Sequence, residues 1–427
     1  MTPRPPVIRT KAETVLADAF AQSRASLPGG DAVRGQRTRA FDVFHERGLP
    51  HRRIEAWHYT DLRNLMREAY PITHGTPAAA PASGLRVVIR DGVCTLPTGA
   101  LPAGLKLTTL RDALAGASDE LVHALFPDQG ADDAMVAFNA AMARDGVLIE
   151  IAPGAVIAEP IELDVIASGD APHGDISRSL VMVGEGARAS ILESHAAPPK
   201  VQRNSAMIFA VGAGASLAHV FETCADSPEL HISTLIADVG KDARFESFAF
   251  VSAGEVLRRQ AFVRGSGEGV KIALRGVNLL NGKQHADTTL VVDHAVPHGE
   301  SRELFKTILD GEASCVFQGK VVVRPHAQKT DGGMKSQAIL LSDDAAMYNK
   351  PELEIFADDV VCGHGATVGQ LDAEQIFYLM ARGLPRAQAE GMIIEGFARE
   401  ALEFVGDEAI RERLGAGLAA WLARRAS

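Results

Sequence analysis

Residues 183–188 read Val-Gly-Glu-Gly-Ala-Arg, and the phrase returns as Val-Gly-Ala-Gly-Ala-Ser at 211–216 and as Val-Gly-Lys-Asp-Ala-Arg at 239–244. Its first glycine stands at positions 184, 212 and 240, so the two steps between copies are equal. A looser copy, Ser-Gly-Glu-Gly-Val-Lys at 266–271, nearly keeps the rhythm. A fixed period of this length is typical of a solenoid or a propeller, in which each repeat packs on its neighbours.

The stretch that carries this repeat has the pattern of β-strands. From about residue 146 to 370, short runs alternate apolar and polar side chains, as in Val-Leu-Ile-Glu-Ile at 147–151. A turn that contains glycine allows a positive φ, and the small residue after it fits where coils stack. An antiparallel sandwich is the competing interpretation, but it does not predict equal spacing. We therefore expect a parallel β-helix, with Gly184, Gly212 and Gly240 at equivalent corners about 4.8 Å, or a small multiple of it, apart.

Helical patterns flank the repeats. Residues 10–70 show apolar side chains at helical spacing, and a Pro- and Ala-rich stretch at 74–84 marks a boundary. Helical spacing returns after Leu371, and the last helix carries one apolar stripe, which we interpret as domain core rather than partner surface. The expected parts are a helical N-terminal domain at 1–75, a linker with a small mixed α/β segment at 76–145, the β-helix core at 146–370 and a helical C-terminal domain at 371–427.

Composition excludes several classes of protein. The 427 residues are 46% hydrophobic but only 5% aromatic, so small and branched aliphatic side chains must fill most of the interior. The formal net charge of -11 argues against nucleic-acid binding, because no cluster of Lys and Arg is present to neutralise phosphates. The first residues lack the apolar run of a secretory signal, and no stretch reaches the length of a membrane helix. We expect a soluble, cytoplasmic protein that binds neither nucleic acid nor membrane.

Cysteine usage and motifs give no sign of an enzyme. Cys94, Cys224, Cys315 and Cys362 stand far apart and form no C-x-x-C pair. Neither a disulfide framework nor a zinc ribbon is indicated, so each is interpreted as a reduced, buried thiol. The sequence holds no complete phosphate loop, no G-x-S-x-G elbow and no H-E-x-x-H helix.

Two regions nevertheless gather side chains that bind metals. The first region holds His285, Asp287, His294 and His298. Imidazole and carboxylate groups suit metals such as iron or zinc, but this spacing also arises in ordinary polar loops. The pattern leaves a metal site and a polar loop both open.

The second region is Cys362-Gly363-His364-Gly365. In an extended strand Cys362 and His364 point to the same face, and the glycines around the histidine leave that face uncovered for a partner or a ligand. A purely structural histidine is the alternative.

One long segment resembles a known family. Residues 349–372 read NKPELEIFADDVVCGHGATVGQLD, and they closely resemble the C-terminal signature of the SufB/SufD family of iron-sulfur cluster assembly scaffold proteins. Three shorter segments are similar to other parts of that family: Glu-Ala-Trp-His-Tyr-Thr-Asp-Leu at 55–62, Phe-Asn at 138–139 followed by Asp-Gly at 145–146, and Gln-Lys-Thr-Asp at 328–331. The resemblance spans about residues 50–400.

The resemblance implies a fold, a function and partners. The fold is a right-handed parallel β-helix flanked by helical domains. The function is that of a non-catalytic scaffold subunit with no intrinsic cofactor, which pairs with SufB through the β-helix end and grips the SufC ATPase with its C-terminal helices. A nascent iron-sulfur cluster or iron is held at the SufB interface by a SufB cysteine and by a histidine that corresponds to His364, with Cys362 beside it. An isolated chain could pair with itself through the same surface.

Within the family the chain resembles the SufD branch more than the SufB branch. SufB typically carries a glutamate-bearing phrase where this chain has Gly-His-Gly at 363–365, and usually an additional N-terminal segment with cysteine. The chain departs from many relatives at Gly363, where they have Ser. The competing hypothesis is a stand-alone metal-binding β-helix enzyme that uses the side chains of His285, Asp287, His294 and His298; bound metal in the purified single chain would favour it.

Overall fold

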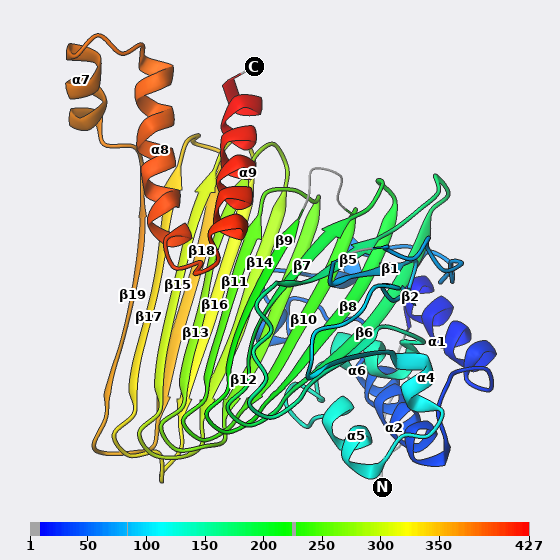
Figure 1. Ribbon diagram of the computed structural model, residues 1–427. Coiled ribbons are helices and arrows are strands. Elements are labelled where there is room, and N and C mark those ends of the chain that lie inside the picture. The colour runs from blue at the N-terminus through cyan, green and yellow to red at the C-terminus, as the bar shows by residue number, and fades with distance from the viewer. Residues whose placement is uncertain (1–8, 83, 224–227, 427) are drawn as a thin grey trace, which may run out of the picture.

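Two long sheets that face each other dominate the computed structural model, which describes residues 9–82, 84–223 and 228–426 (Figure 1). The strands are β1 (Arg86–Arg90), β2 (Val93–Thr95), β3 (Leu105–Thr109), β4 (Val147–Ile151), β5 (Ile161–Ile166), β6 (His173–Val183), β7 (Arg188–Ala196), β8 (Val201–Val211), β9 (Ser216–Thr223), β10 (Leu230–Val239), β11 (Arg244–Val251), β12 (Val256–Gly265), β13 (Lys271–Leu280), β14 (His285–His294), β15 (Glu300–Leu309), β16 (Ser314–Val323), β17 (Asp331–Leu340), β18 (Ala346–Ile355) and β19 (Val361–Gly369). Ten form one sheet in the order β19-β17-β15-β13-β11-β9-β7-β5-β1-β2, and nine form the other in the order β18-β16-β14-β12-β10-β8-β6-β4-β3.

The chain winds between these sheets as a solenoid. From β4 onward, consecutive strands alternate between the sheets, and each pairs in parallel with the strand two places further along the chain. Val183, Val211 and Val239 are direct neighbours in this register. The glycines that follow them therefore occupy equivalent corners of successive coils, and the predicted parallel β-helix core is confirmed.

The length of a coil is not constant. His173 pairs with Val201 in the next coil, which matches the step seen in the sequence, whereas Leu230 pairs with Val256 after a shorter step. The last full step in the nine-stranded sheet, from Cys315 in β16 to Met347 in β18, is longer than either. The equal steps seen in the sequence therefore hold only for the coils from β6 to β11, and the steps from β4 to β6 and from β5 to β7 before them are longer.

Each corner uses its two glycine positions differently. The left-handed conformation belongs to the fourth residue of the repeated phrase, with φ of 65° at Gly186 and 63° at Gly214. The second residue permits close stacking instead, because a Cβ on Gly212 would lie 2.7 Å from the carbonyl oxygen of Val183 in the preceding coil. The fourth position of the phrase favours glycine because its φ is positive, and the second position favours glycine because there is no space for a Cβ.

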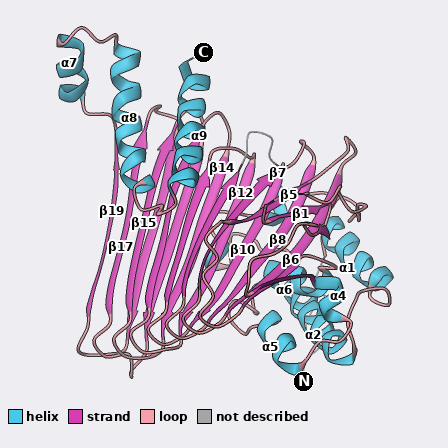
Figure 2. Cartoon of the chain, in the orientation of Figure 1, coloured by secondary structure: helices cyan, strands magenta, loops and turns pink. Residues whose placement is uncertain are grey.

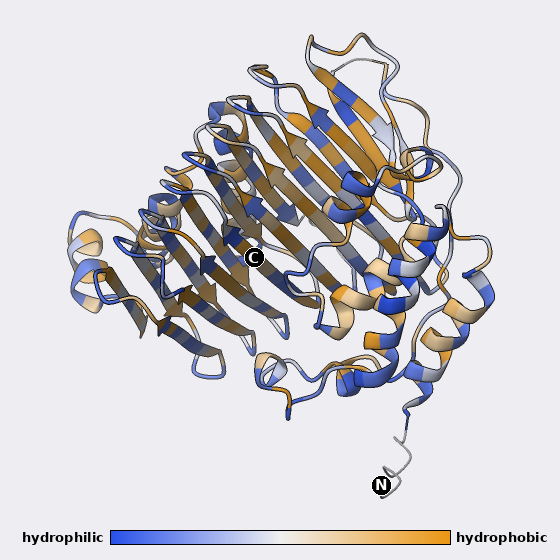
Figure 3. Ribbon diagram, turned by 90° about the horizontal axis from the view of Figure 1, so that it is seen from below, coloured by the Kyte–Doolittle hydropathy of each residue, from blue (hydrophilic) through white to orange (hydrophobic). Residues whose placement is uncertain are grey.

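The lumen between the sheets is mainly apolar. Alternate side chains of each strand point inward, and they form one cluster that runs from Val87 through Phe209 and Phe245 to Met334. Figure 3 shows hydrophobic and hydrophilic residues alternating along the strands. This alternation is the period of two that predicted strands.

A polar layer interrupts the lumen near its middle. Glu193 lies 2.7 Å from the Nε2 atom of His195 and 3.0 Å from that of His219, and all three side chains are buried. Burial raises the pKa of Glu193, but the two histidines outweigh it and the net shift is downward. Burial lowers the pKa of both histidines. The layer is therefore a buried, ionised carboxylate held by hydrogen bonds to two imidazoles.

Helices cover the outer faces of both sheets (Figure 2). They are α1 (Lys11–Ser23), α2 (Asp31–Arg47), the short 3-10 helix η1 (Glu55–Trp57), α3 (Leu62–Leu65), α4 (Leu110–Leu114), α5 (Asp119–Leu125), α6 (Ala134–Met142), α7 (Ala373–Ala381), α8 (Arg386–Leu402) and α9 (Glu408–Ala426). Within the described residues, none of the helices is long and apolar enough to cross a membrane.

The N-terminal helices pack on the nine-stranded sheet, where Val33 and Val136 join a cluster with Leu180 and Ile208. Strands β1 to β3, from the segment expected to be a linker with a small mixed α/β part, extend the two sheets at their N-terminal end. This segment therefore closes the solenoid as well as connecting it to the helices before it.

The C-terminal helices α8 and α9 pack on the ten-stranded sheet. Leu414 and Trp421 of α9 are buried in a cluster with Val220 and Phe248 of the sheet, so the apolar stripe of the last helix is domain core, as predicted. Helix α7 projects away from the sheets (Figure 1). Its side chains Phe377, Tyr378 and Met380 are exposed.

Candidate functional site

Cys362 and His364 lie on β19, an edge strand of the ten-stranded sheet, and in the described part of the chain this strand pairs with β17 alone. Cys362 is half-buried and packs against the lumen cluster. His364 is exposed, and it shares the lumen-facing side of the strand because side chains two residues apart point the same way. A Cβ on Gly363 or Gly365 would meet nothing within 4 Å. The thiol and the imidazole thus stand together at the open end of the solenoid.

Gly332 leaves a gap behind Cys362. It lies between Ser301 and Cys362 in the register of β15, β17 and β19. A Cβ placed on Gly332 would lie 3.3 Å from the sulfur of Cys362 and 3.6 Å from the hydroxyl oxygen of Ser301. Burial raises the pKa of Cys362. Because its sulfur lies next to Gly332, the Cys362 thiol is reached from the lumen as well as from the open end of the solenoid.

Glu303 lies in the same part of the lumen, and sequence reasoning did not single it out. Its side chain is buried, and neither carboxylate oxygen has a hydrogen-bond partner in the described structure. Burial raises its pKa to about 8, so the carboxyl group is largely protonated at neutral pH. Only the strand register could have pointed to Glu303. Glu303 pairs with Met334 and Met334 pairs with His364, so the register aligns the carboxyl group with the candidate site.

The other metal-ligand region is not assembled into a site. His285 bonds to Thr60 Oγ1 at 3.0 Å and to Ser314 Oγ at 2.8 Å. Asp287 forms a fully buried ion pair of 2.5 Å with Arg258. Both side chains are therefore held by the protein itself.

His294 lies at the far end of strand β14 from His285, about 30 Å away at 3.3 Å per residue. Burial lowers the pKa of His294 to about 4. His298 stands in a corner with φ 61° and pairs with Glu268 at 3.8 Å. Across the described residues, no group of three or more His, Cys, Asp or Glu side chains is arranged to hold a metal ion. The proposed four-residue metal cluster is therefore wrong, since a single extended strand separates its members.

Two further described cysteines, Cys94 and Cys315, contribute no reactive thiol to the site. Cys94 and Cys315 are buried and free, and burial raises the pKa of Cys315 to about 12. Cys224 lies outside the described residues. Cys362 is the described cysteine that reaches the surface.

The strands of the last coil are open on one side. Within residues 9–82, 84–223 and 228–426, each of β18 and β19 has a strand neighbour on one side only, so a row of backbone groups at the sheet edge is free for pairing. Apolar side chains are exposed beside these edges, and they include Phe356 at 59% and Val361 at 73% of full exposure. Such an edge, next to exposed apolar groups, is typical of a surface that meets another protein.

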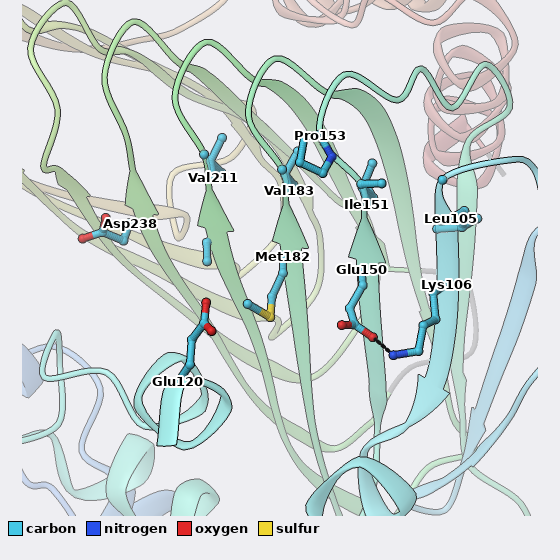
Figure 4. Close-up of a pocket in the computed structure, with 15 residues that line it drawn as sticks. Leu105, Lys106, Glu120, Glu150, Ile151, Pro153, Met182, Val183, Val211 and Asp238 are labelled. Atoms are coloured by element: carbon cyan, nitrogen blue, oxygen red, sulfur yellow. Dashed lines mark hydrogen bonds and ion pairs between the residues drawn. The ribbon is translucent and has the colours of Figure 1, made fainter. Parts of the chain in front are cut away.

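A groove lies at the other end of the nine-stranded sheet, over β4, β6 and β8 and beside α5 (Figure 4). Lys106 and Glu150 form an ion pair of 2.5 Å in it, and Met182 and Val211 supply apolar walls. The groove contains no Cys or His side chain. It is separate from the thiol and the imidazole of the last coil.

Comparison with known proteins agrees with the signature segments. A family described as "SUF system FeS cluster assembly, SufBD core domain" matches residues 165–397, and one described as "SufBD protein N-terminal region" matches residues 10–80. The iron-sulfur cluster assembly protein SufD of Escherichia coli is 31% identical over 380 residues, which cover 86% of this chain and 88% of the relative.

More distant relatives extend the same result. An iron-sulfur cluster assembly SufBD family protein of Synechocystis is 29% identical over 404 residues, 89% of each chain. One from Mycobacterium leprae is 29% identical over 382 residues, 87% of this chain and 90% of the relative. The core match alone spans more than half of the chain and takes in the solenoid from β6 to β19, the strand that bears Cys362 and His364. The chain is therefore a member of the SufBD family of the SUF system, whose members take part in iron-sulfur cluster assembly.

Proposed function

We propose that the chain is the SufD-type subunit of a cytoplasmic complex with SufB and SufC, and that it is a scaffold without catalytic activity of its own. The observation that carries the proposal is the last coil, where two open strand edges and the Cys362–His364 pair share one end of the solenoid. Strand edges give a partner backbone groups to pair with, while the thiol and imidazole give it a place to share a metal-containing substrate.

His364 is the residue we assign to the substrate. Imidazole nitrogen and thiolate sulfur suit iron, which is the metal that cluster assembly handles. A nascent cluster or iron would be held between His364 and ligands of SufB, with Cys362 either as a further ligand or as a group that packs beside the histidine. The described donors of this chain are too few to hold a metal alone, so the site is complete only with the partner.

Helix α7 is the part that we assign to SufC. Helix α7 projects away from the sheets, and the side chain of Phe377 on it is 73% exposed. Helices α8 and α9, in contrast, pack their apolar faces on the ten-stranded sheet. An exposed apolar side of a short helix fits a groove of a partner.

Co-purification from the source cell tests the proposal. A chain with an affinity tag should bring down SufB and SufC in fixed proportions, and the isolated chain should show neither turnover nor stoichiometric iron. A tagged chain recovered without SufB, or an isolated chain that binds iron at one equivalent, would contradict it. Self-pairing of the isolated chain is measured separately by its mass in solution, and addition of SufB should replace it.

A further inference from the structure

The segment 55–60 crosses the outer face of the last strands of the nine-stranded sheet. Its contacts fall on successive strands: Arg258 of β12, Asp287 of β14, Gln318 of β16 and Lys350 of β18. We call residues 55–60 the strap. Because β12, β14, β16 and β18 are consecutive in that sheet, the strap runs across four coils.

The anchored part of the strap is buried and charged. Trp57 is almost fully buried, its ring lies 3.8 Å from the guanidinium of Arg258, and its Nε1 donates to Asp133 at 2.7 Å. Arg258 also donates to the carbonyl oxygen of Ala56 at 2.7 Å while paired with Asp287. A buried ion pair of this kind fixes geometry, since loss of either partner would leave an uncompensated charge.

Two residues of the strap, Glu55 and Tyr59, reach the edge strand β18. Glu55 pairs with Lys350 at 2.7 Å, and Tyr59 stacks on Tyr348 with ring centroids 5.1 Å apart. Both partners are on the outer side of β18, whose only strand neighbour among the described residues is β16. Strand β18 therefore has a second attachment that does not use its open edge.

We propose that the strap positions the last coil, and with it the face that we assign to SufB. Strand β18 forms one wall of that coil and β19, which carries Cys362 and His364, forms the other. Because the strap contacts the outer side of β18, the edge of that strand stays free for a partner, while the contacts limit how far β18 can move away from β19. This inference rests on the proposed function for the identity of the partner, but the positioning itself is a property of the single chain.

A charge swap separates positioning from general damage. Glu55→Lys places two cations together, Lys350→Glu places two anions together, and the double variant restores an opposite pair. Hydrogen exchange of the isolated chain over residues 346–369 should become about fivefold faster in each single variant, which is the upper end of what one exposed ion pair supplies. It should return most of the way to the wild-type rate in the double variant, which restores the pair at 55 and 350 but not the 3.4 Å pair of Lys350 with Glu352. Lys106→Glu, which breaks the ion pair with Glu150 in the distant groove, is the matched control and should leave this exchange unchanged.

The same variants are then tested for SufB capture, which should weaken in both single variants and recover in the swap. Unchanged exchange at 346–369 in the single variants would overturn the proposal, and so would faster exchange with undiminished SufB capture. If the wild-type chain captures no SufB, the proposed function fails, while the exchange data still decide whether the strap holds the coil.

Discussion

Glu303 and His364 lie on one line across the ten-stranded sheet, with Met334 between them in the register. The line runs along the lumen side, from a buried carboxyl group without hydrogen-bond partners in the described structure to an exposed imidazole at the open end. The candidate site therefore has a buried side as well as an outer one. The acid on the buried side gives the first prediction.

Glu303→Gln should change the dependence of stability on pH. The folded-state pKa of about 8 lies above the ordinary 4.5, so the folded chain keeps a proton that the unfolded chain releases. Stability from this group is complete below about pH 4.5 and is lost as pH rises toward 8. The variant should therefore exceed the wild type in melting temperature at pH 9, and the difference should shrink toward pH 5. Equal differences at both pH values would show that Glu303 is not protonated in the folded chain.

His364→Ala should leave the fold and the complex intact, because the side chain is exposed and its loss opens no cavity. Cluster content of the recovered complex should fall roughly tenfold or more, as for the loss of a metal-site residue. Cys362→Ser should have a smaller effect. Gly363→Ala is the matched control, since its Cβ meets nothing within 4 Å. A wild-type cluster content in an intact His364→Ala complex would make this histidine structural.

Phe377→Ser together with Tyr378→Ser should abolish SufC capture and leave SufB capture unchanged. Both side chains are exposed on α7, so the fold should not suffer. Removing the chain from Leu371 onward is a poorer test, because it would uncover Phe248 and its neighbours on the ten-stranded sheet. Val156→Ser, at a similarly exposed apolar residue far from α7, serves as the control. Pull-down with each partner is the measurement, and SufC retained by the double variant would place its contact elsewhere.

Gly212→Ala should lower the free energy of unfolding by about 1–3 kcal/mol, the usual range for forcing atoms into a packed place. The added Cβ would approach the carbonyl oxygen of Val183 and the amide nitrogen of Glu185 in the coil before it. Chemical denaturation of the isolated chain measures the change. Gly363→Ala again supplies a control with no close neighbour, and an effect as large as that of Gly212→Ala would rule out crowding at the corner as the cause.

The sequence was sufficient for the architecture because the coils from β6 to β11 repeat with a constant step. Gly184 and Gly212 mark corners that stack through hydrogen bonds to the coil before, so their spacing is a direct record of the fold. The C-terminal stripe was equally informative, since helical periodicity reports which face is covered. Both features are local in sequence or periodic along it.

The parts that sequence reasoning missed depend on register and on distant contacts. Glu303, Met334 and His364 are aligned by coils that are longer than those that carry the glycine repeat, so the constant step of that repeat could not place them side by side. The prediction of a metal site around His285 was wrong for a related reason. Several ligand types in one short stretch suggested a cluster, but they lie along one extended strand that holds His285 and His294 apart. The strap joins two of the signature segments, but no periodicity connects Glu55 to Lys350.

The Glu55–Lys350 pair also has a bearing on synthesis. The two residues are 295 positions apart, so at about 5–20 residues per second the ribosome needs on the order of 15–60 s to supply the second after the first. During that time the strap cannot form its contacts with β18, because that strand has not yet been synthesised. The pair can close only after the solenoid has emerged as far as β18, which makes it a late contact in the order of folding. In a chain that stalls before β18, Glu55 and Tyr59 lack their partners Lys350 and Tyr348. This is a surface difference between an unfinished chain and a finished one.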